Sequence, residues 1–166
     1  MKTKVFYFTG TGNSLYVAKQ IVKNIDNSEL ISISKIIDTK INFICDKIII
    51  VFPVYLWGLP NIISEFINKI KVSPSILIYA VATNKGLADD PHKYIVRILQ
   101  KNNTKLSGGF LVWMPENFIL RYPPFPKFLE RFCLKTADKK IVKVINIITA
   151  VQDNFNLRAP IAKHRY

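Results

Sequence analysis

The strongest constraint on the fold is a regular alternation of strand patterns with helix patterns along the chain. Residues 4–8 (KVFYF) are apolar and rich in strand-forming side chains, and residues 14–25 place apolar side chains on one helical face. A weaker strand pattern lies at 30–34. Residues 47–52 (KIIIVF) form a continuous β-branched run, which is typical of a strand buried on both faces of a parallel sheet. Residues 36–46 favour neither state.

The same alternation continues to the end of the chain. The further patterns are a helix at 61–70, a strand at 75–83, a helix at 91–101, a strand at 108–113 and an amphipathic segment at 127–154, which fits one helix or two. Five strands alternating with helices predict an α/β fold, a doubly wound five-stranded parallel sheet with helices on both faces. We expect strand order 2-1-3-4-5, with the alternating strand 30–34 at an edge.

This topology predicts where a ligand binds. In open parallel sheets, ligands lie outside the carboxyl ends of the strands where the strand order reverses, here between the first and third strands. The loops that follow the first, third and fourth strands are therefore the informative ones.

Length, apolar runs and cysteine content limit the class of protein. A chain of 166 residues suits one domain, which we assign to residues 1–157, followed by a basic tail at 158–166. No apolar run is long enough to predict a membrane span, and residues 1–4 lead into a strand without a cleavage site, so we expect a cytoplasmic protein. Two isolated cysteines, Cys45 and Cys133, exclude a disulfide framework or a four-cysteine metal site within this chain, and we expect reduced, structural thiols.

The first loop has the composition of an anion-binding loop. Successive backbone N–H groups, two glycines and the positive end of the following helix can converge on a phosphate. It lacks the spacing and the lysine of a nucleoside-triphosphate loop, and Leu15 replaces the third glycine of the dinucleotide fingerprint. The alternative is an ordinary helix cap formed by Asn13 or Ser14. The candidate phosphate ligands are Thr9, Gly10, Thr11, Gly12, Asn13 and Ser14.

The second loop places two large aromatic side chains at the carboxyl end of the central strand. Either could stack on a planar ring, and Gly58 leaves the backbone free to reorient. The alternative is that both aromatic side chains pack as the rim of the core. The candidate residues are Pro53, Val54, Tyr55, Leu56, Trp57 and Gly58.

Taken together, these segments resemble the flavodoxin family, and most closely the flavodoxin domain of bacterial proteins that continue into a two-cluster ferredoxin. Residues 7–14 (YFTGTGNS) look like the FMN-phosphate loop of that family. Residues 53–60 (PVYLWGLP) are similar to its loop against the flavin ring, and residues 114–118 (MPENF) resemble a further family motif. The resemblance spans most of the chain and implies FMN as the cofactor, held by the candidate residues above.

The third loop departs from the family pattern. Thr83, Asn84, Lys85 and Gly86 stand where a small or cysteine-containing glycine-rich sequence is usual, so the pyrimidine edge of the flavin would be held differently. We still count these four residues as cofactor-binding candidates. The cysteine-rich ferredoxin module of the fused proteins is absent from the sequence, so an iron–sulfur partner would be a separate protein.

The resemblance implies a redox carrier more than a substrate-specific enzyme, and we assign no catalytic residue and no metal ligand. Flavodoxins are usually acidic, whereas this chain has 24 Lys and Arg against 11 Asp and Glu, a formal net charge of +13. We therefore expect an acidic redox partner such as a ferredoxin. Two alternatives are an FMN-dependent reductase of a quinone, porphyrinogen or similar small molecule, and a flavodoxin-like binding protein whose flavin site has decayed.

Nucleic acid is the other class of partner that a basic chain suggests. Lys135, Lys139, Lys140 and Lys143 follow helical spacing, but such a run is usually a solvated helix face, and no RNA-binding aromatic motif accompanies it. We therefore expect no nucleic-acid partner. An alternative that needs no acidic partner is that the lysine enrichment reflects an AT-rich coding background and only keeps a hydrophobic chain soluble.

Overall fold

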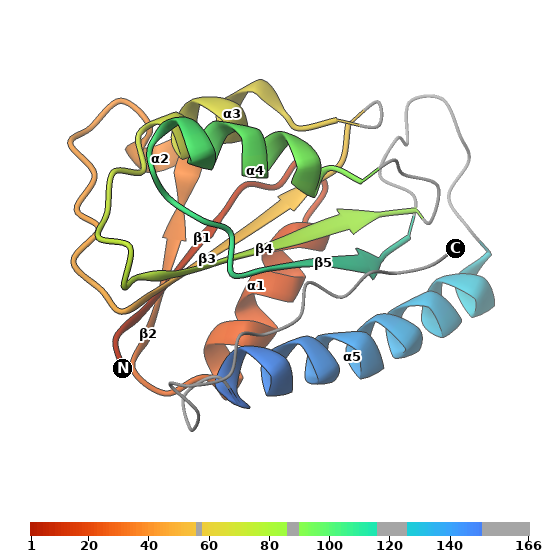
Figure 1. The fold of residues 1–166 in the computed structure, drawn as a ribbon. Helices are drawn as coiled ribbons and strands as arrows, with labels where there is room; N and C mark the ends of the chain where they lie inside the picture. Colours follow the sequence, from red (N-terminus) through yellow and green to blue (C-terminus); the bar gives the residue numbers. More distant parts are fainter. Residues whose placement is uncertain (56–57, 86–89, 116–125, 151–166) are drawn as a thin grey trace.

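Five parallel strands form one sheet in the order β2-β1-β3-β4-β5, which confirms the expected topology (Figure 1). The computed structural model describes residues 1–55, 58–85, 90–115 and 126–150. The strands are β1 (Thr3–Tyr7), β2 (Ser28–Ser32), β3 (Lys47–Pro53), β4 (Leu77–Asn84) and β5 (Gly108–Trp113). The central strand β3 is buried over its whole length, as its β-branched run predicts.

The register of the sheet brings the informative loops to one edge. Tyr7 pairs with Val51, and Pro53 pairs with Thr83, so β1, β3 and β4 end close to the same level. The N–H of Phe8 donates to the carbonyl of Val51 (3.0 Å), which extends the β1–β3 contact into the first loop. The loops after these three strands therefore open side by side.

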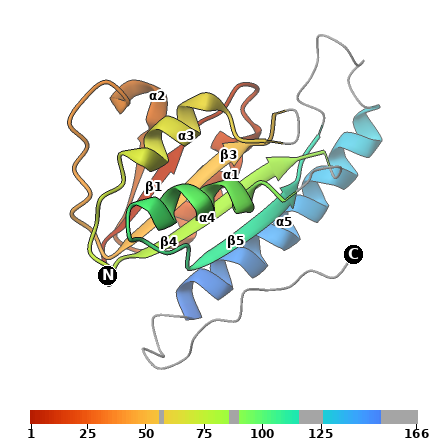
Figure 2. The same cartoon turned by 45° about the horizontal axis from the view of Figure 1, so that its top comes forward.

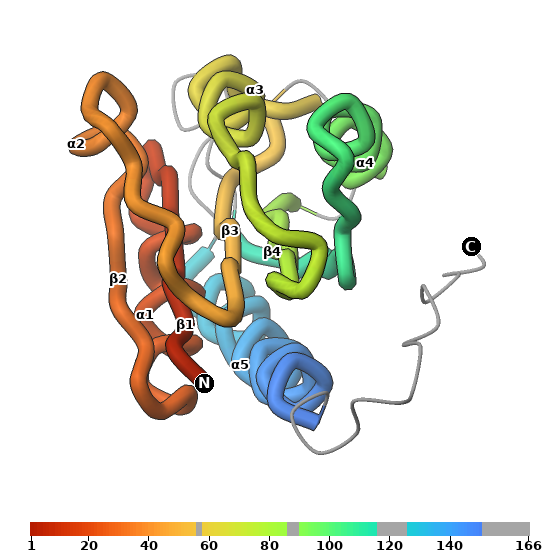
Figure 3. Tube along the Cα trace, turned by 60° about the vertical axis from the view of Figure 1, so that its left-hand side comes forward, coloured from red at the N-terminus to blue at the C-terminus, as the bar shows by residue number. Residues whose placement is uncertain are grey.

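Helices cover both faces of the sheet. Figure 3 shows α3 (Asn61–Asn68) and α4 (His92–Lys101) on one side and α5 (Lys127–Ala150) on the other. Apolar side chains of β3 and β4 alternate between two separate core clusters. One cluster packs against α3, α4 and the short α2 (Ile33–Ile36), and the other packs against α1 (Asn13–Asn24) and α5.

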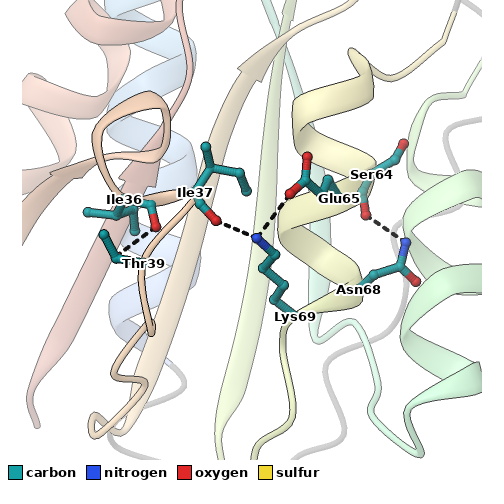
Figure 4. A network of polar contacts seen from close by, with 7 residues as sticks. All are labelled: Ile36, Ile37, Thr39, Ser64, Glu65, Asn68 and Lys69. Atoms are coloured by element: carbon teal, nitrogen blue, oxygen red, sulfur yellow. Dashed lines mark hydrogen bonds and ion pairs between the residues drawn. The ribbon is translucent and has the colours of Figure 1, made fainter.

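A lysine joins two of the helical segments on the α3 side. Lys69 Nζ forms an ion pair with Glu65 (2.9 Å), one helical turn away, and donates to the carbonyl of Ile37 just after α2 (Figure 4). Because Ile37 follows the short helix α2, this contact fixes the end of α2 against α3. The contact stabilises the scaffold at a distance from the three loops.

A second lysine lies inside the core. Lys47, the first residue of β3, is fully buried, and its Nζ donates to the carbonyl of Ile148 in the last turn of α5 (2.7 Å). Burial in an apolar environment lowers the pKa of Lys47, while the helix carboxyl end favours a positive charge there. The contact connects the central strand to the end of α5.

Several boundaries differ from the sequence prediction by one or two residues, and at β2 the difference changes the type of element. The strand expected at 30–34 lies at Ser28–Ser32, because the chain turns into helix α2 at Ile33, whose side chain is buried against the sheet. β2 nevertheless lies at the predicted edge position. The segment from Lys127 is a single helix as far as Ala150, and its expected continuation to 154, like the tail at 158–166, lies outside the described residues. Among the helices of the described ranges, none combines the length and apolarity needed to cross a membrane.

Candidate functional site

The first loop opens α1 with unpaired backbone donors. The first helical hydrogen bond runs from Tyr16 N–H to the carbonyl of Gly12 (2.9 Å), so the N–H groups of residues 13–15 have no acceptor within the helix. No side chain caps this end, and no described residue accepts from those three N–H groups. The helix-cap alternative is therefore wrong for both Asn13 and Ser14. The open donors lie where the helix dipole favours an anion.

Gly12 supplies the backbone turn that exposes these donors. Its φ of 97° lies in the left-handed region that favours glycine, and a Cβ built there meets no atom within 4 Å. The space next to Gly12 is therefore open on the side where a Cβ would point. Unpaired donors at a helix start next to open space fit a terminal phosphate.

Side chains of the loop hold it to neighbouring strands. Thr9 Oγ1 accepts from the N–H of Gly12 (3.0 Å), and its own hydroxyl proton stays available to a ligand. The Asn13 amide donates to the carbonyl of Pro115 (2.9 Å), just past β5. These contacts order the loop before any ligand binds. Thr11 is exposed and makes no hydrogen bond to a described residue.

Ser14 points into the protein. Its buried hydroxyl lies 2.8 Å from Thr83 Oγ1, and Thr83 in turn donates weakly to the carbonyl of Phe52 (3.4 Å). The two hydroxyls connect the start of α1 to the end of β4. Ser14 can therefore reach a phosphate through its backbone N–H, while its side chain positions the loop.

Tyr55 connects the second loop to the first. Its N–H donates to the carbonyl of Gly58 (3.2 Å), and the N–H of Gly58 donates back to the carbonyl of Tyr55 (2.8 Å), so Tyr55 and Gly58 pair as an antiparallel bridge. The Tyr55 ring meets Phe8 edge-on at 6.3 Å, and a Cβ on Gly10 would lie 2.5 Å from its hydroxyl. Tyr55 is 40% exposed, which leaves part of its ring open to a ligand.

The electrostatics of the site favour an anion bound mostly by neutral groups. Burial raises the pKa of Tyr55, so its hydroxyl stays protonated beside the first loop. Among the described residues of segments 8–14, 53–60 and 83–85, Lys85 is the one charged side chain, and Asp90, further along the third loop, pairs with His92. Lys85 follows Asn84, whose carbonyl accepts from the N–H of Met114 (2.8 Å) and ties the third loop to β5.

The structure brings most of the expected site residues together, and a few lie beyond its description. The first loop, Pro53 to Tyr55, Gly58 and Thr83 to Lys85 gather at the carboxyl edge between β1, β3 and β4. The expected residues Leu56, Trp57 and Gly86 lie outside the described residues, as do positions 116–118 of the third motif. An open cavity of about 910 Å³ lies at the opposite edge, lined by residues of 40–46 and 71–76, far from these loops.

Sequence reasoning missed Phe8 as the partner of the Tyr55 ring, and it missed the hydroxyl pair of Ser14 and Thr83. Phe8 stands directly after β1, and its apolar side chain continues the strand pattern of residues 4–8, which hides its place in the loop. The hydroxyl pair joins residues 69 positions apart and left no local pattern.

His92 and the two cysteines are held in structural environments. His92 begins α4, and its Nδ1 lies 2.8 Å from the Asp90 carboxylate, which also accepts from the His92 N–H (3.0 Å). Both cysteines are free, and burial raises the pKa of each thiol, which keeps them protonated. Within the described ranges, no group of three His, Cys, Asp or Glu side chains could hold a metal ion.

The fold and the loop cluster define a class: a doubly wound α/β protein with an uncapped helix start at the switch point of its sheet. The pattern that describes the flavodoxin domain matches residues 4–153. The chain belongs to the flavodoxin domain family.

Solved structures share this fold at low sequence identity. An azoreductase from Bacillus anthracis str. Sterne is 12% identical, with a TM-score of 0.59, over 89% of this chain and 100% of its own. A flavodoxin from the domain Archaea is 16% identical, with a TM-score of 0.52, over 84% of this chain and 98% of its own.

A third structure with this fold was solved with a ligand. An FMN-dependent NADH-azoreductase from Bacillus anthracis str. Ames Ancestor, solved in complex with FMN, is 10% identical, with a TM-score of 0.57, over 89% of this chain and 99% of its own. The family match supports FMN as the expected cofactor. No curated protein matches the sequence.

Proposed function

We propose that this protein binds FMN at the carboxyl edge of its sheet and carries electrons to or from an acidic iron–sulfur protein in the cytoplasm. The observation that carries the proposal is the uncapped start of α1, where the N–H groups of residues 13–15 have no acceptor among the described residues and the left-handed Gly12 has open space beside it. A terminal phosphate is the ligand that such a set of neutral donors suits best.

The phosphate ligands are residues 9–14. Backbone N–H groups supply most of the donors, and the hydroxyls of Thr9 and Thr11 complete the shell. Ser14 contributes its N–H only, because its hydroxyl is paired with Thr83. Binding a dianion without a cation in the loop relies on the helix dipole and on exclusion of competing water.

The ring site belongs to the second and third loops. Tyr55 offers the exposed part of its ring, and Trp57 is expected to flank the flavin with it. The Gly58 carbonyl accepts one hydrogen bond, from Tyr55, and keeps a second lone pair that it is expected to offer to the flavin. Thr83, Asn84, Lys85 and Gly86 are expected to face the pyrimidine edge. When bound, FMN supplies the redox chemistry, accepting two electrons and two protons on full reduction.

Uptake of FMN is the first test. Protein mixed with FMN and desalted should keep the visible flavin bands, and Thr11→Asp should abolish them, because a carboxylate beside the phosphate adds like-charge repulsion. Thr39→Asp, an exposed position away from the three loops, is the matched control and should retain FMN. Wild-type protein that takes up no FMN would refute the proposal and leave a decayed flavin site as the remaining explanation.

A small-molecule reductase is the second candidate, because structures named as azoreductases share this fold. Turnover separates the two functions. A carrier should show negligible steady-state oxidation of NADH with a quinone or azo dye, and its anaerobic reduction should proceed in two separable one-electron steps. Rapid turnover and a single two-electron step would assign the protein to the reductases instead.

A further inference from the structure

The first six residues of α5 extend beyond the carboxyl end of the sheet. Cys133 Sγ lies 3.9 Å from the carbonyl oxygen of Trp113, the last residue of β5. Because α5 begins at Lys127 and an α-helix rises about 1.5 Å per residue, roughly 9 Å of helix precedes that contact. Figures 1 and 2 show this cyan start of α5 projecting past the ends of β4 and β5, at the edge where the three loops lie.

This projecting segment carries two phenylalanines that the fold leaves in solvent. Phe128 is 69% exposed and Phe132 is 62% exposed, whereas Cys133 next to them is 1% exposed. Residues four apart share a helix face, so the two rings form one apolar strip. Aromatic side chains clustered on a rigid element are the kind of anchor that a partner protein buries.

Cations flank the strip. Lys127, Arg131 and Lys135 repeat at four-residue spacing, and with the two phenylalanines they line a shallow cavity of about 410 Å³. None of the three forms an ion pair with a described residue, so their charge is available to another molecule. Between 127 and 135 the single acidic residue is Glu130.

We propose that Lys127, Phe128, Arg131, Phe132 and Lys135 form the docking surface for the acidic redox partner; this rests on the function proposed above. The surface, here named the α5 docking surface, lies at the same edge as the candidate flavin loops, so a protein seated on it would bring its redox centre toward that edge. In each productive encounter one electron leaves the reduced cluster, which is oxidised, and enters the flavin. Two encounters and two protons from solvent complete the reduction.

The charges favour this occupant over the others. A second copy would place like charges face to face, and the segment 151–166 carries three Lys and Arg against one Asp, so both would be repelled. A membrane would need a continuous apolar face, but the same helical face continues from Phe132 into Lys139 and Lys143. An acidic rim around an apolar centre complements the surface best.

A charge-reversal experiment tests the surface against the overall field of the protein. The FMN-loaded full chain is mixed in a stopped-flow instrument with a reduced, acidic two-cluster ferredoxin as the probe, at low and at high salt. The docking variant combines Lys127→Glu, Arg131→Glu and Lys135→Glu. The matched control combines Lys40→Glu, Lys71→Glu and Lys101→Glu, three exposed lysines at the opposite edge, and changes the net charge equally.

At low ionic strength the docking variant should lose about tenfold or more in second-order rate, and the control less than about threefold. At about 0.5 M salt the three proteins should converge, since screening removes the steering term. An equal loss in both variants would show that only net charge matters. No loss in the docking variant, or no electron transfer to the wild type, would overturn the proposal.

The phenylalanines give a second, independent measurement. Phe128→Ser combined with Phe132→Ser should slow transfer about tenfold at both salt concentrations, because the apolar contact is insensitive to screening, while FMN affinity stays unchanged. Vesicles with 30% phosphatidylserine test the membrane alternative. Vesicle binding that this variant abolishes, together with an unchanged ferredoxin rate, would assign the surface to a membrane and overturn the proposal.

Failure of the docking surface can be told apart from failure of the proposed function. Protein that takes up FMN and is reduced by dithionite, but transfers electrons equally in all variants, refutes the surface alone. Protein without FMN refutes the proposed function. In that case anisotropy of a labelled ferredoxin still reports docking to the unloaded chain, and equal affinities for the docking and control variants would reject the surface.

Discussion

Adding one methyl group at Gly10 should weaken FMN binding through Tyr55 rather than through the backbone. A Cβ on Gly10 would lie 2.5 Å from the Tyr55 hydroxyl, whereas ordinary contact starts near 3.5 Å, so the hydroxyl must move by about 1 Å. The φ of Gly10 is not in the left-handed region, so the backbone itself accepts alanine. The strain therefore falls on the aromatic side chain that connects the two loops.

The size of the effect follows from how freely Tyr55 can move. Overpacking in a closed core costs about 1–3 kcal/mol, but Tyr55 is 40% exposed and can yield, so we expect about 1 kcal/mol, or roughly a fivefold rise in the Kd for FMN. Tyr55→Phe removes the clashing oxygen, and the next atom, Cζ, lies at 3.8 Å in ordinary contact. Gly10→Ala should therefore cost almost nothing in the Tyr55→Phe background.

Quenching of FMN fluorescence on titration with unloaded protein measures the four Kd values of this double-mutant cycle. The expected coupling energy is about 1 kcal/mol. Gly12→Ala is the matched control, since a Cβ there meets no atom but would have to adopt a φ of 97°. Its cost should be the same with Tyr55 or with Tyr55→Phe. Equal losses from Gly10→Ala in both backgrounds would refute the role assigned to Tyr55.

Three further predictions concern stability in urea unfolding. Gly109→Ala should lower the free energy of unfolding by about 2 kcal/mol, because its Cβ would lie 2.6 Å from the buried His92 ring; a change under 0.5 kcal/mol would contradict this contact. Ser14→Ala should cost about 1 kcal/mol by breaking the buried hydrogen bond to Thr83, and an unchanged midpoint would show that the bond contributes nothing. Burial lowers the pKa of Lys47. Between that lowered value and about 10.4 the unfolded chain binds more protons at this site than the folded chain does, so the stability of the wild type relative to Lys47→Met should rise with pH. A relative stability that falls with pH over this window would reject the burial of Lys47.

The sequence predicted the sheet because its signal is local and repeated. Each buried strand of a parallel sheet consists of a continuous run of apolar residues, and this pattern is clearest in the sequences of β3 and β4. The error at β2 has a physical cause. Ile33 is apolar and continues the alternating pattern of the strand, but it is the first residue of helix α2 and is buried there. An alternating pattern over five residues cannot distinguish a longer strand from a strand that turns into a helix.

The phosphate loop was recognisable for the same reason: its glycines, hydroxyls and helix start are contiguous in sequence. What links it to the rest of the site is not contiguous. The Ser14–Thr83 hydroxyl pair and the contact of Asn13 with Pro115 join residues 69 and 102 positions apart. Such contacts depend on how strands are ordered in the sheet, so they became visible only with the topology in place.

The two glycines of the first loop are glycine for different structural reasons. In the sequence, Gly10 and Gly12 stand two positions apart and suggest one shared requirement for a flexible backbone. In the structure Gly12 is glycine because of its φ and has open space beside it, whereas Gly10 is glycine because the Tyr55 hydroxyl occupies the place of a Cβ. One position constrains the course of the chain and the other constrains volume. A substitution elsewhere, at Tyr55, can therefore relieve the requirement at Gly10 but leaves that at Gly12 intact.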